Sequence, residues 1–409
     1  MKSLFLKNYF LLIPLFYILL IPIIQAFVCE SQAIIGWYFL LGLGSVIFIK
    51  SKKITFSFVE ILFIVIFLML NVYYLFINQV GTIYVKYTYI FLLTLFLSKF
   101  INSIDIKEIS KKMSFLYGAV TLLLLLEYIF VFIFGNSIFV NSLSCNEPGI
   151  VGYRYISNYS LFSSFISTPG MNSILLGPQT ATQISLASLI WFFIVYKNSD
   201  NPFFYKTLIC IAFFILVFSP TLTASLMFLF FLFIVGIYLA QKSLIRMSHI
   251  SLSFILFTIL VGYFLSMVYS RYGGFAIIMD DLVVPQVFNI SFLTYKEILL
   301  GLRLDRVTQL FPVAEIAMIH HIVIFGIIGV SVFLSFVGYY LIKSYQTINN
   351  LSADERAFYL ASLLIVILFL FSNLHYQVMF QIGLMELFAI HLAYIVSLTF
   401  RSHKMPTDY

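Results

Sequence analysis

Charged residues are scarce in this chain of 409 residues. Asp, Glu, Lys and Arg together make up 10% of it and hydrophobic residues 62%, whereas soluble domains contain about 25% charged and about 45–50% apolar residues. A chain with so few charges cannot cover a water-facing surface of its own. The composition therefore excludes an ordinary soluble protein and predicts an integral membrane protein.

Cysteine is also rare, and Cys29, Cys145 and Cys210 show no C-x-x-C spacing. This spacing excludes a thioredoxin-like motif and gives no support for a zinc site. A disulfide between Cys29 and Cys145 stays open, because both are expected on the same side of the membrane, but free thiols fit the pattern better. No cluster of metal ligands stands out, so we expect neither a metal nor a cofactor.

Internal repeats, Gly/Ser-rich linkers and large cytoplasmic segments are absent from the sequence, so we expect one membrane domain covering residues 1–409. The predicted cytoplasmic loops are too short for a nucleotide-binding fold, which excludes ATP bound by this chain as an energy source. The net charge is +7, but in a membrane protein the positions of Lys and Arg matter more than their sum. Nucleic-acid binding is unsupported.

Long apolar runs are what the sequence has instead. A helix needs about 20 apolar residues to cross the roughly 30 Å hydrocarbon core, where only helices or closed barrels satisfy the backbone. We therefore predict an all-α polytopic membrane protein with about twelve transmembrane helices, the first of them uncleaved. The predicted spans lie near residues 9–28, 33–49, 56–77, 83–99, 114–135, 175–196, 205–219, 222–241, 250–269, 314–342, 357–373 and 380–400.

The basic residues predict which way the chain is threaded. With both termini in the cytoplasm, most of the 23 Lys and Arg residues fall in inside loops, as the positive-inside rule requires. Two outer loops are unusually long, at about 136–174 and 270–313. Function is therefore expected to face outward. The basic residues on or near the outer face are Lys86, Arg154, Arg271, Lys296, Arg303 and Arg306.

The second long loop is dense in charge and includes Arg271, Arg303 and Arg306. Its YKEILLG segment (295–301) looks helical and is a candidate for the membrane interface. Arginine carries a fixed fork of donors that suits phosphate and diphosphate, and Arg154 is the one basic residue of the first long loop. The four arginines are candidates for an anion site; the alternatives, solvated loop charges and an Arg154 that snorkels to lipid headgroups, stay open.

The stretch AEIAMIHHIVIFGIIGV (314–330) places titratable groups at the head of an apolar run. On one helix, His320 would lie about 7.5 Å deeper than Glu315 and about 140° around the axis, so the two do not share a face. Glu315 is a candidate catalytic carboxylate, because a charge at the membrane boundary is costly without a partner. His320 and His375 are further catalytic candidates, whereas His321 is expected to be a packed structural histidine.

Several segments carry a family resemblance. EILLG (297–301) is followed by AEIAMIHHIVIFGIIGVSVFL (314–334), with Glu315 at a polar position and Gly326 to Gly329 as a glycine-rich turn. This order is similar to the end of the large periplasmic loop and the next helix in the O-antigen polymerase and ligase superfamily. GPQTATQISLASL, SPTLTASLMFL and SNLHYQVMFQIGLMELFAIHLAYI resemble further segments, the last of them the closing hairpin of Wzy-type polymerases.

The resemblance implies an O-antigen or capsular repeat-unit polymerase of the bacterial inner membrane, acting in lipopolysaccharide or related polysaccharide biosynthesis. It implies glycosyl transfer at the periplasmic face, from an undecaprenyl-diphosphate-linked oligosaccharide to a sugar hydroxyl of the next lipid-linked repeat unit. Arg154, Arg271, Arg303 and Arg306 are then assigned to the diphosphate and Glu315 to the catalytic base, with His320 or His375 in reserve. Whether a chain-length regulator binds stays open.

Two departures from the family pattern bear on this hypothesis. Ligases typically carry His where Glu315 stands, which favours a polymerase, and many relatives carry Arg where Pro220 stands, which leaves the anion site to the loop arginines. The alternatives are an O-antigen ligase and a lipid-linked oligosaccharide flippase or transporter. Glu60, Glu127 and Glu386 do lie in or near predicted spans, but a transporter would be expected to show related halves.

Overall fold

The secondary-structure elements in the described part of the chain are α-helices, joined by turns. The computed structural model describes residues 56–79, 81–101, 105–134, 178–195, 201–218, 284–311, 317–348, 351–373 and 384–401, with Leu232 and Gly262. The helices are α4 (Phe58–Phe76), α5 (Gly81–Ile101), α6 (Ile106–Phe134), α8 (Pro178–Val195), α9 (Pro202–Phe218), α13 (Val284–Ile290), α14 (Tyr295–Leu300), α15 (Leu304–Leu310), α16 (Ala317–Tyr345), α17 (Ala353–Ser372) and α18 (Leu384–Arg401).

The lengths and compositions of these helices fit a membrane protein. Four are long and apolar enough to cross a bilayer: Phe58–Phe76, Lys107–Leu126, Met318–Tyr345 and Ala353–Ser372. Shorter apolar helices cover Thr182–Val195, Pro202–Leu216 and Leu384–Thr399. The all-α membrane class predicted from the sequence is thus supported in this part of the chain, whereas the spans predicted near 9–28, 33–49, 222–241 and 250–269 lie outside the described residues, apart from Leu232 and Gly262.

The starts of three helices follow one local sequence rule, S/T-x-x-E. In each, the hydroxyl accepts from the backbone N–H of the glutamate while the glutamate side chain accepts from the backbone N–H of the Ser or Thr, which satisfies two donors that a helix start leaves free. The pairs are Ser57 with Glu60 in α4, Thr294 with Glu297 in α14, and Ser352 with Glu355 in α17.

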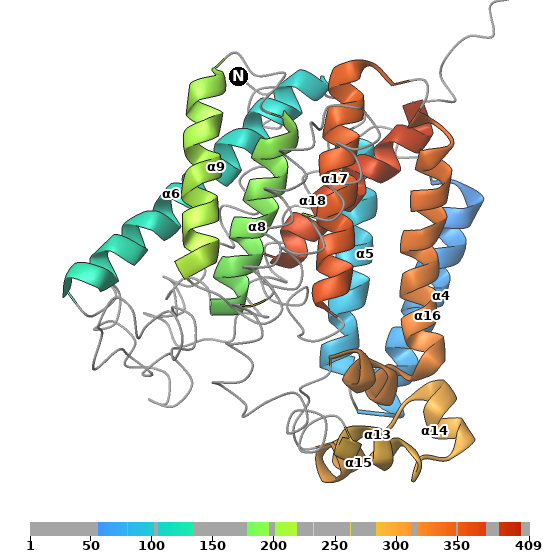
Figure 1. Ribbon diagram of the computed structural model, residues 1–409. Coiled ribbons are helices and arrows are strands. Elements are labelled where there is room, and N and C mark those ends of the chain that lie inside the picture. The colour runs from blue at the N-terminus through green and yellow to red at the C-terminus, as the bar shows by residue number, and fades with distance from the viewer. Residues whose placement is uncertain are drawn as a thin grey trace, which may run out of the picture.

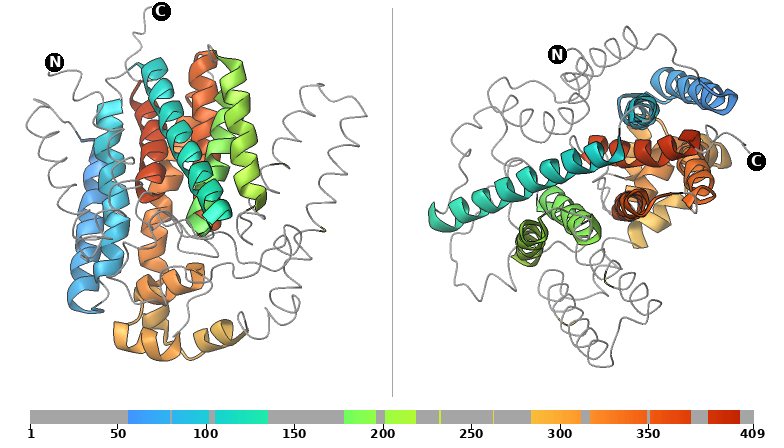
Figure 2. Two further views of the ribbon diagram at one scale, coloured as in Figure 1. Left: turned by 90° about the vertical axis from the view of Figure 1, so that its left-hand side faces the viewer. Right: turned by 90° about the horizontal axis from the view of Figure 1, so that it is seen from above.

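Helices α5 and α18 lie side by side at the centre of the bundle, with α4 and α16 on one side and α6, α8, α9 and α17 on the other (Figures 1 and 2). Aromatic side chains fill the contact of α4, α5 and α16. The rings of Phe67 and Phe91 stack with centroids 4.4 Å apart, and Phe336 meets Phe91 edge-on at 4.8 Å. Such packing fixes how α4 and α16 stand against α5.

Several helix boundaries differ by a few residues from those predicted, and two of the differences have a visible local cause. The helix predicted to begin at residue 114 begins at Ile106, because the charged KEISKKM segment is helical although it is not apolar; Glu108 and Lys112 pair across one turn at 3.1 Å. The helix predicted over 314–342 extends to Tyr345, and Gly326 interrupts it with φ 64° and ψ 173°. The glycine-rich turn expected at Gly326 is therefore a kink within α16.

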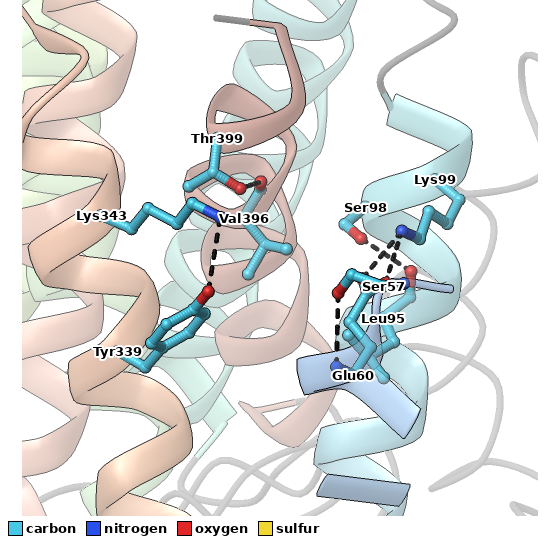
Figure 3. Close-up of polar contacts among 9 residues, drawn as sticks. All are labelled: Ser57, Glu60, Leu95, Ser98, Lys99, Tyr339, Lys343, Val396 and Thr399. Atoms are coloured by element: carbon cyan, nitrogen blue, oxygen red, sulfur yellow. Dashed lines mark hydrogen bonds and ion pairs between the residues drawn. The ribbon is translucent and has the colours of Figure 1, made fainter. Parts of the chain in front are cut away.

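The short helices α13, α14 and α15 lie across one end of the bundle, which we call the loop end (Figure 1). The last turn of α4 and the first turns of α5 and α16 are at this end. At the opposite end, Lys99 reaches the buried carboxylate of Glu60, with Nζ 2.8 Å from Oε1 and 2.9 Å from Oε2, and Lys343 donates to the Tyr339 hydroxyl at 3.3 Å (Figure 3).

Candidate functional site at the loop end

Gly301 and Gly326 bring two backbone segments into direct contact. Gly301 follows α14 with φ 83° and ψ 166°, and Gly326 has a similar conformation within α16. A Cβ at Gly301 would lie 2.1 Å from the carbonyl oxygen of Ile324, and a Cβ at Gly326 would lie 2.2 Å from that of Leu299. Because L residues avoid this backbone conformation and the space is already filled by backbone, only glycine fits at either position.

Two groups from outside α16 donate hydrogen bonds to backbone carbonyls next to its kink. The backbone N–H of Leu302 donates to the carbonyl of Val323 at 2.8 Å, and the Tyr74 hydroxyl of α4 donates to the carbonyl of Phe325. A break in a helix frees backbone groups that are costly to leave unpaired in an apolar interior. The kink is therefore stabilised by the loop segment and by α4 together.

Asn78, which follows α4, holds the segment between α14 and α15 from the other side. Its Nδ2 donates to the carbonyl of Leu300 at 3.1 Å, and its own carbonyl accepts from the backbone N–H of Leu304 at 3.1 Å. The chain from Leu300 to Leu304 is thus bonded to both α4 and α16. Arg303 lies within this fixed segment, so the backbone that carries it has a defined position.

Arg303 and Arg306 both carry an ion pair within the loop segment. Arg303 stands before α15 with Nε 3.5 Å from a carboxylate oxygen of Asp305, and Nη1 of Arg306 bonds to the Glu297 carboxylate. Glu297 in turn accepts from the Thr294 N–H and hydroxyl, each at 2.8 Å. Each guanidinium has five N–H donors, so these pairs orient the two groups and leave donors for an anion.

The first turn of α16 places His320 and His321 at the same end. His321 is buried with its ring stacked on Phe325, at 5.8 Å between centroids, and edge-on to Tyr87 at 5.6 Å, which supports the packing role expected for it. Nδ1 of His320 is buried and has no hydrogen-bond partner within the described part of the chain.

The structure thus places Arg303, Arg306 and His320 at one end of the bundle. The other predicted site residues, Glu315, His375, Arg154 and Arg271, lie outside the described residues. Within the described residues, no group of three or more His, Cys, Asp and Glu side chains could hold a metal ion. The one described cysteine, Cys210, is a free and exposed thiol.

A second set of polar groups is buried between the helices. His391 of α18 shares a hydrogen bond of 2.6 Å with the Tyr117 hydroxyl through Nε2, and one of 3.1 Å with Ser362 through Nδ1. The Tyr89 hydroxyl donates to Glu386 at 2.6 Å. His391 was not among the site residues predicted from the sequence, because its partners lie on other helices. Each of these groups has a partner, as expected for polar side chains that join membrane helices.

Comparison of the chain with protein-family models, with curated proteins and with solved structures finds no match. The functional hypothesis is therefore built on the resemblance of the sequence segments and on the geometry at the loop end.

Proposed function

We propose that this protein polymerises undecaprenyl-diphosphate-linked oligosaccharide repeat units into O-antigen or a related surface polysaccharide. The proposed topology has about twelve transmembrane helices in a bacterial inner membrane, with both termini in the cytoplasm and the loop end facing the periplasm. The contact between the EILLG segment and the G-I-I-G kink supports the proposal most. These are two of the segments that carry the family resemblance, and Gly301 packs on Ile324 with no room for a side chain.

The reaction needs positive charge where the diphosphate leaves. The acceptor hydroxyl attacks the anomeric carbon of the donor sugar, the bond from that carbon to the diphosphate oxygen breaks, and the electron pair leaves with the lipid diphosphate. Fixed guanidinium donors stabilise that developing charge, and we assign this role to Arg303, Arg306, Arg154 and Arg271. Arg303 and Arg306 lie on one short segment, beside Asp305 and Glu297.

The acceptor hydroxyl must also lose its proton. A positioned carboxylate or imidazole serves as a general base. We assign this role to Glu315, which stands two residues before α16 begins. His320 and His375 are the alternative bases.

Lipid-linked oligosaccharide transport is the second candidate, and one observation favours it. Glu386 and His391 are buried inside the bundle, and ionisable groups inside a membrane often mark a transport pathway. Their hydrogen bonds to Tyr89 and Tyr117 instead favour a role in helix packing. Loss of the protein separates the candidates: single repeat units on lipid A indicate a polymerase, no glycan on lipid A a ligase, and lipid-linked units trapped inside the cell a flippase.

Reconstitution tests the proposal directly. Purified protein in proteoliposomes is given undecaprenyl-diphosphate-linked repeat units, and the product is read as a length ladder on a gel. We expect a ladder from the wild type, little or none from Arg306→Ala and Glu315→Ala, and an unchanged ladder from Arg356→Ala, an exposed arginine at the opposite end. Ladders of normal length from both Arg306→Ala and Glu315→Ala would show that the assigned residues do not perform the reaction.

A further inference from the structure

Large apolar side chains are exposed along α13 and α14. Phe288 is 61% exposed and Tyr295 88%, and Val287, Phe292 and Leu299 are exposed as well. The ring of Phe288 in α13 meets that of Phe292, in the turn before α14, edge-on at 5.1 Å. We call these five residues the aromatic face. An apolar patch of this kind is rare on a water-facing surface and indicates a partner.

The depth of the aromatic face follows from its bonds to α4. This helix has 19 residues, which corresponds to about 28 Å, close to the roughly 30 Å hydrocarbon core of a bilayer. Glu60, Phe67 and Tyr74 are its buried residues, so most of its surface is free to meet lipid. Asn78, just past its end, bonds to Leu300 and Leu304. The segment that carries the aromatic face therefore lies where the hydrocarbon core ends.

We infer that α13 and α14 form a membrane-interface anchor, which inserts the aromatic face into the headgroup region of the leaflet at the loop end. Aromatic rings beside basic residues are typical of this region, and Lys296 directly follows Tyr295. Leu75 and Phe76 at the end of α4, and Ile77 just past it, are exposed apolar side chains as well. A lipid surface would cover both sets of side chains.

The membrane-interface anchor does not depend on the proposed function, but it has a consequence for that function. Arg303 and Arg306 follow α14 directly and would lie at the depth of lipid phosphates, which is where the diphosphate of a lipid-linked donor is held. A second copy of the chain is the competing occupant of the aromatic face. When one protein molecule is alone in a bilayer, lipid can still cover the aromatic face but a second copy of the chain cannot.

Fluorescence quenching in nanodiscs that hold one protein molecule each tests the anchor. Cys29, Cys145 and Cys210 are replaced by Ser, and an NBD probe is attached at Phe288→Cys or, in a second protein, at Tyr295→Cys. Both side chains are exposed, so neither change disturbs the core. The matched control is a probe at Gln309→Cys, an exposed polar position in α15. The bilayer is phosphatidylethanolamine and phosphatidylglycerol with a doxyl group near the headgroup or deep in the chain.

We expect the probes at 288 and 295 to emit at shorter wavelength than the control, to lose fluorescence most with the shallow doxyl group, and to resist aqueous iodide. The control should be quenched by iodide instead. Iodide quenching at 288 and 295 with no effect of doxyl lipid would overturn the anchor. So would protection that occurs only when two protein molecules share a disc, because a second copy then covers the face. Neither outcome predicts a change in the gel ladder, so the anchor and the proposed polymerase function can be refuted independently.

Discussion

Replacing Gly326 by alanine is expected to release the segment that carries α14 and α15 from the kink in α16. A non-glycine residue in this backbone conformation costs on the order of 1–3 kcal/mol. The added Cβ would also lie 2.2 Å from the Leu299 oxygen and 2.4 Å from its carbonyl carbon, an overlap with backbone that typically costs about 1–3 kcal/mol. The sum of about 2–6 kcal/mol lowers the docked population relative to the undocked one by at least about 30-fold.

Labelling of a buried cysteine measures this release. Leu302 is buried and its N–H bonds to Val323, so a cysteine at 302, in a chain without other cysteines, should resist a membrane-impermeant maleimide while the segment is docked. Adding Gly326→Ala should make it reactive. Gly338→Ala is the control in the same helix, since a Cβ there has no atom within 4 Å. Equal protection in all three proteins would refute the docking.

Three further substitutions have expected outcomes. Lys99→Met should lower the unfolding temperature in detergent, because an unpaired buried Glu60 costs about 3–5 kcal/mol, and adding Glu60→Gln should restore much of the loss. Tyr117→Phe should cost about 1–3 kcal/mol by leaving His391 unsatisfied, with the gel ladder unchanged at low temperature; loss of function in a fully folded variant would favour transport. Arg306→Ala should leave little or no ladder without changing the unfolding temperature, and a drop in the unfolding temperature would instead indicate a structural role.

Helices that are determined by residues close together in the chain could be predicted from the sequence. The YKEILLG segment was expected to be helical and is, because Thr294 and Glu297 cap its start and Gly301 ends it. The apolar runs likewise predicted the helices of the described bundle. The start of α6 was placed too late, because hydropathy falls at its charged first turns, where Glu108 and Lys112 stabilise the helix instead.

Contacts between distant residues could not be predicted in this way. Nothing near Gly326 in the sequence indicates that Gly301 packs against it, or that Tyr74, about 250 residues earlier, donates to Phe325. The same holds for His391, whose partners lie on α6 and α17. The anion site was predicted from residue type alone, and its ion pairs to Asp305 and Glu297 depend on how the loop segment folds.

Binding of the lipid diphosphate tests the central claim most directly. Undecaprenyl diphosphate is titrated into single-protein nanodiscs holding the wild type, the Arg303→Ala/Arg306→Ala double variant or the Arg356→Ala control. If the loop end holds the donor, the double variant should bind more weakly than the wild type and lose much of the salt dependence of binding, whereas the control should match the wild type. Equal affinity for all three proteins would contradict the account.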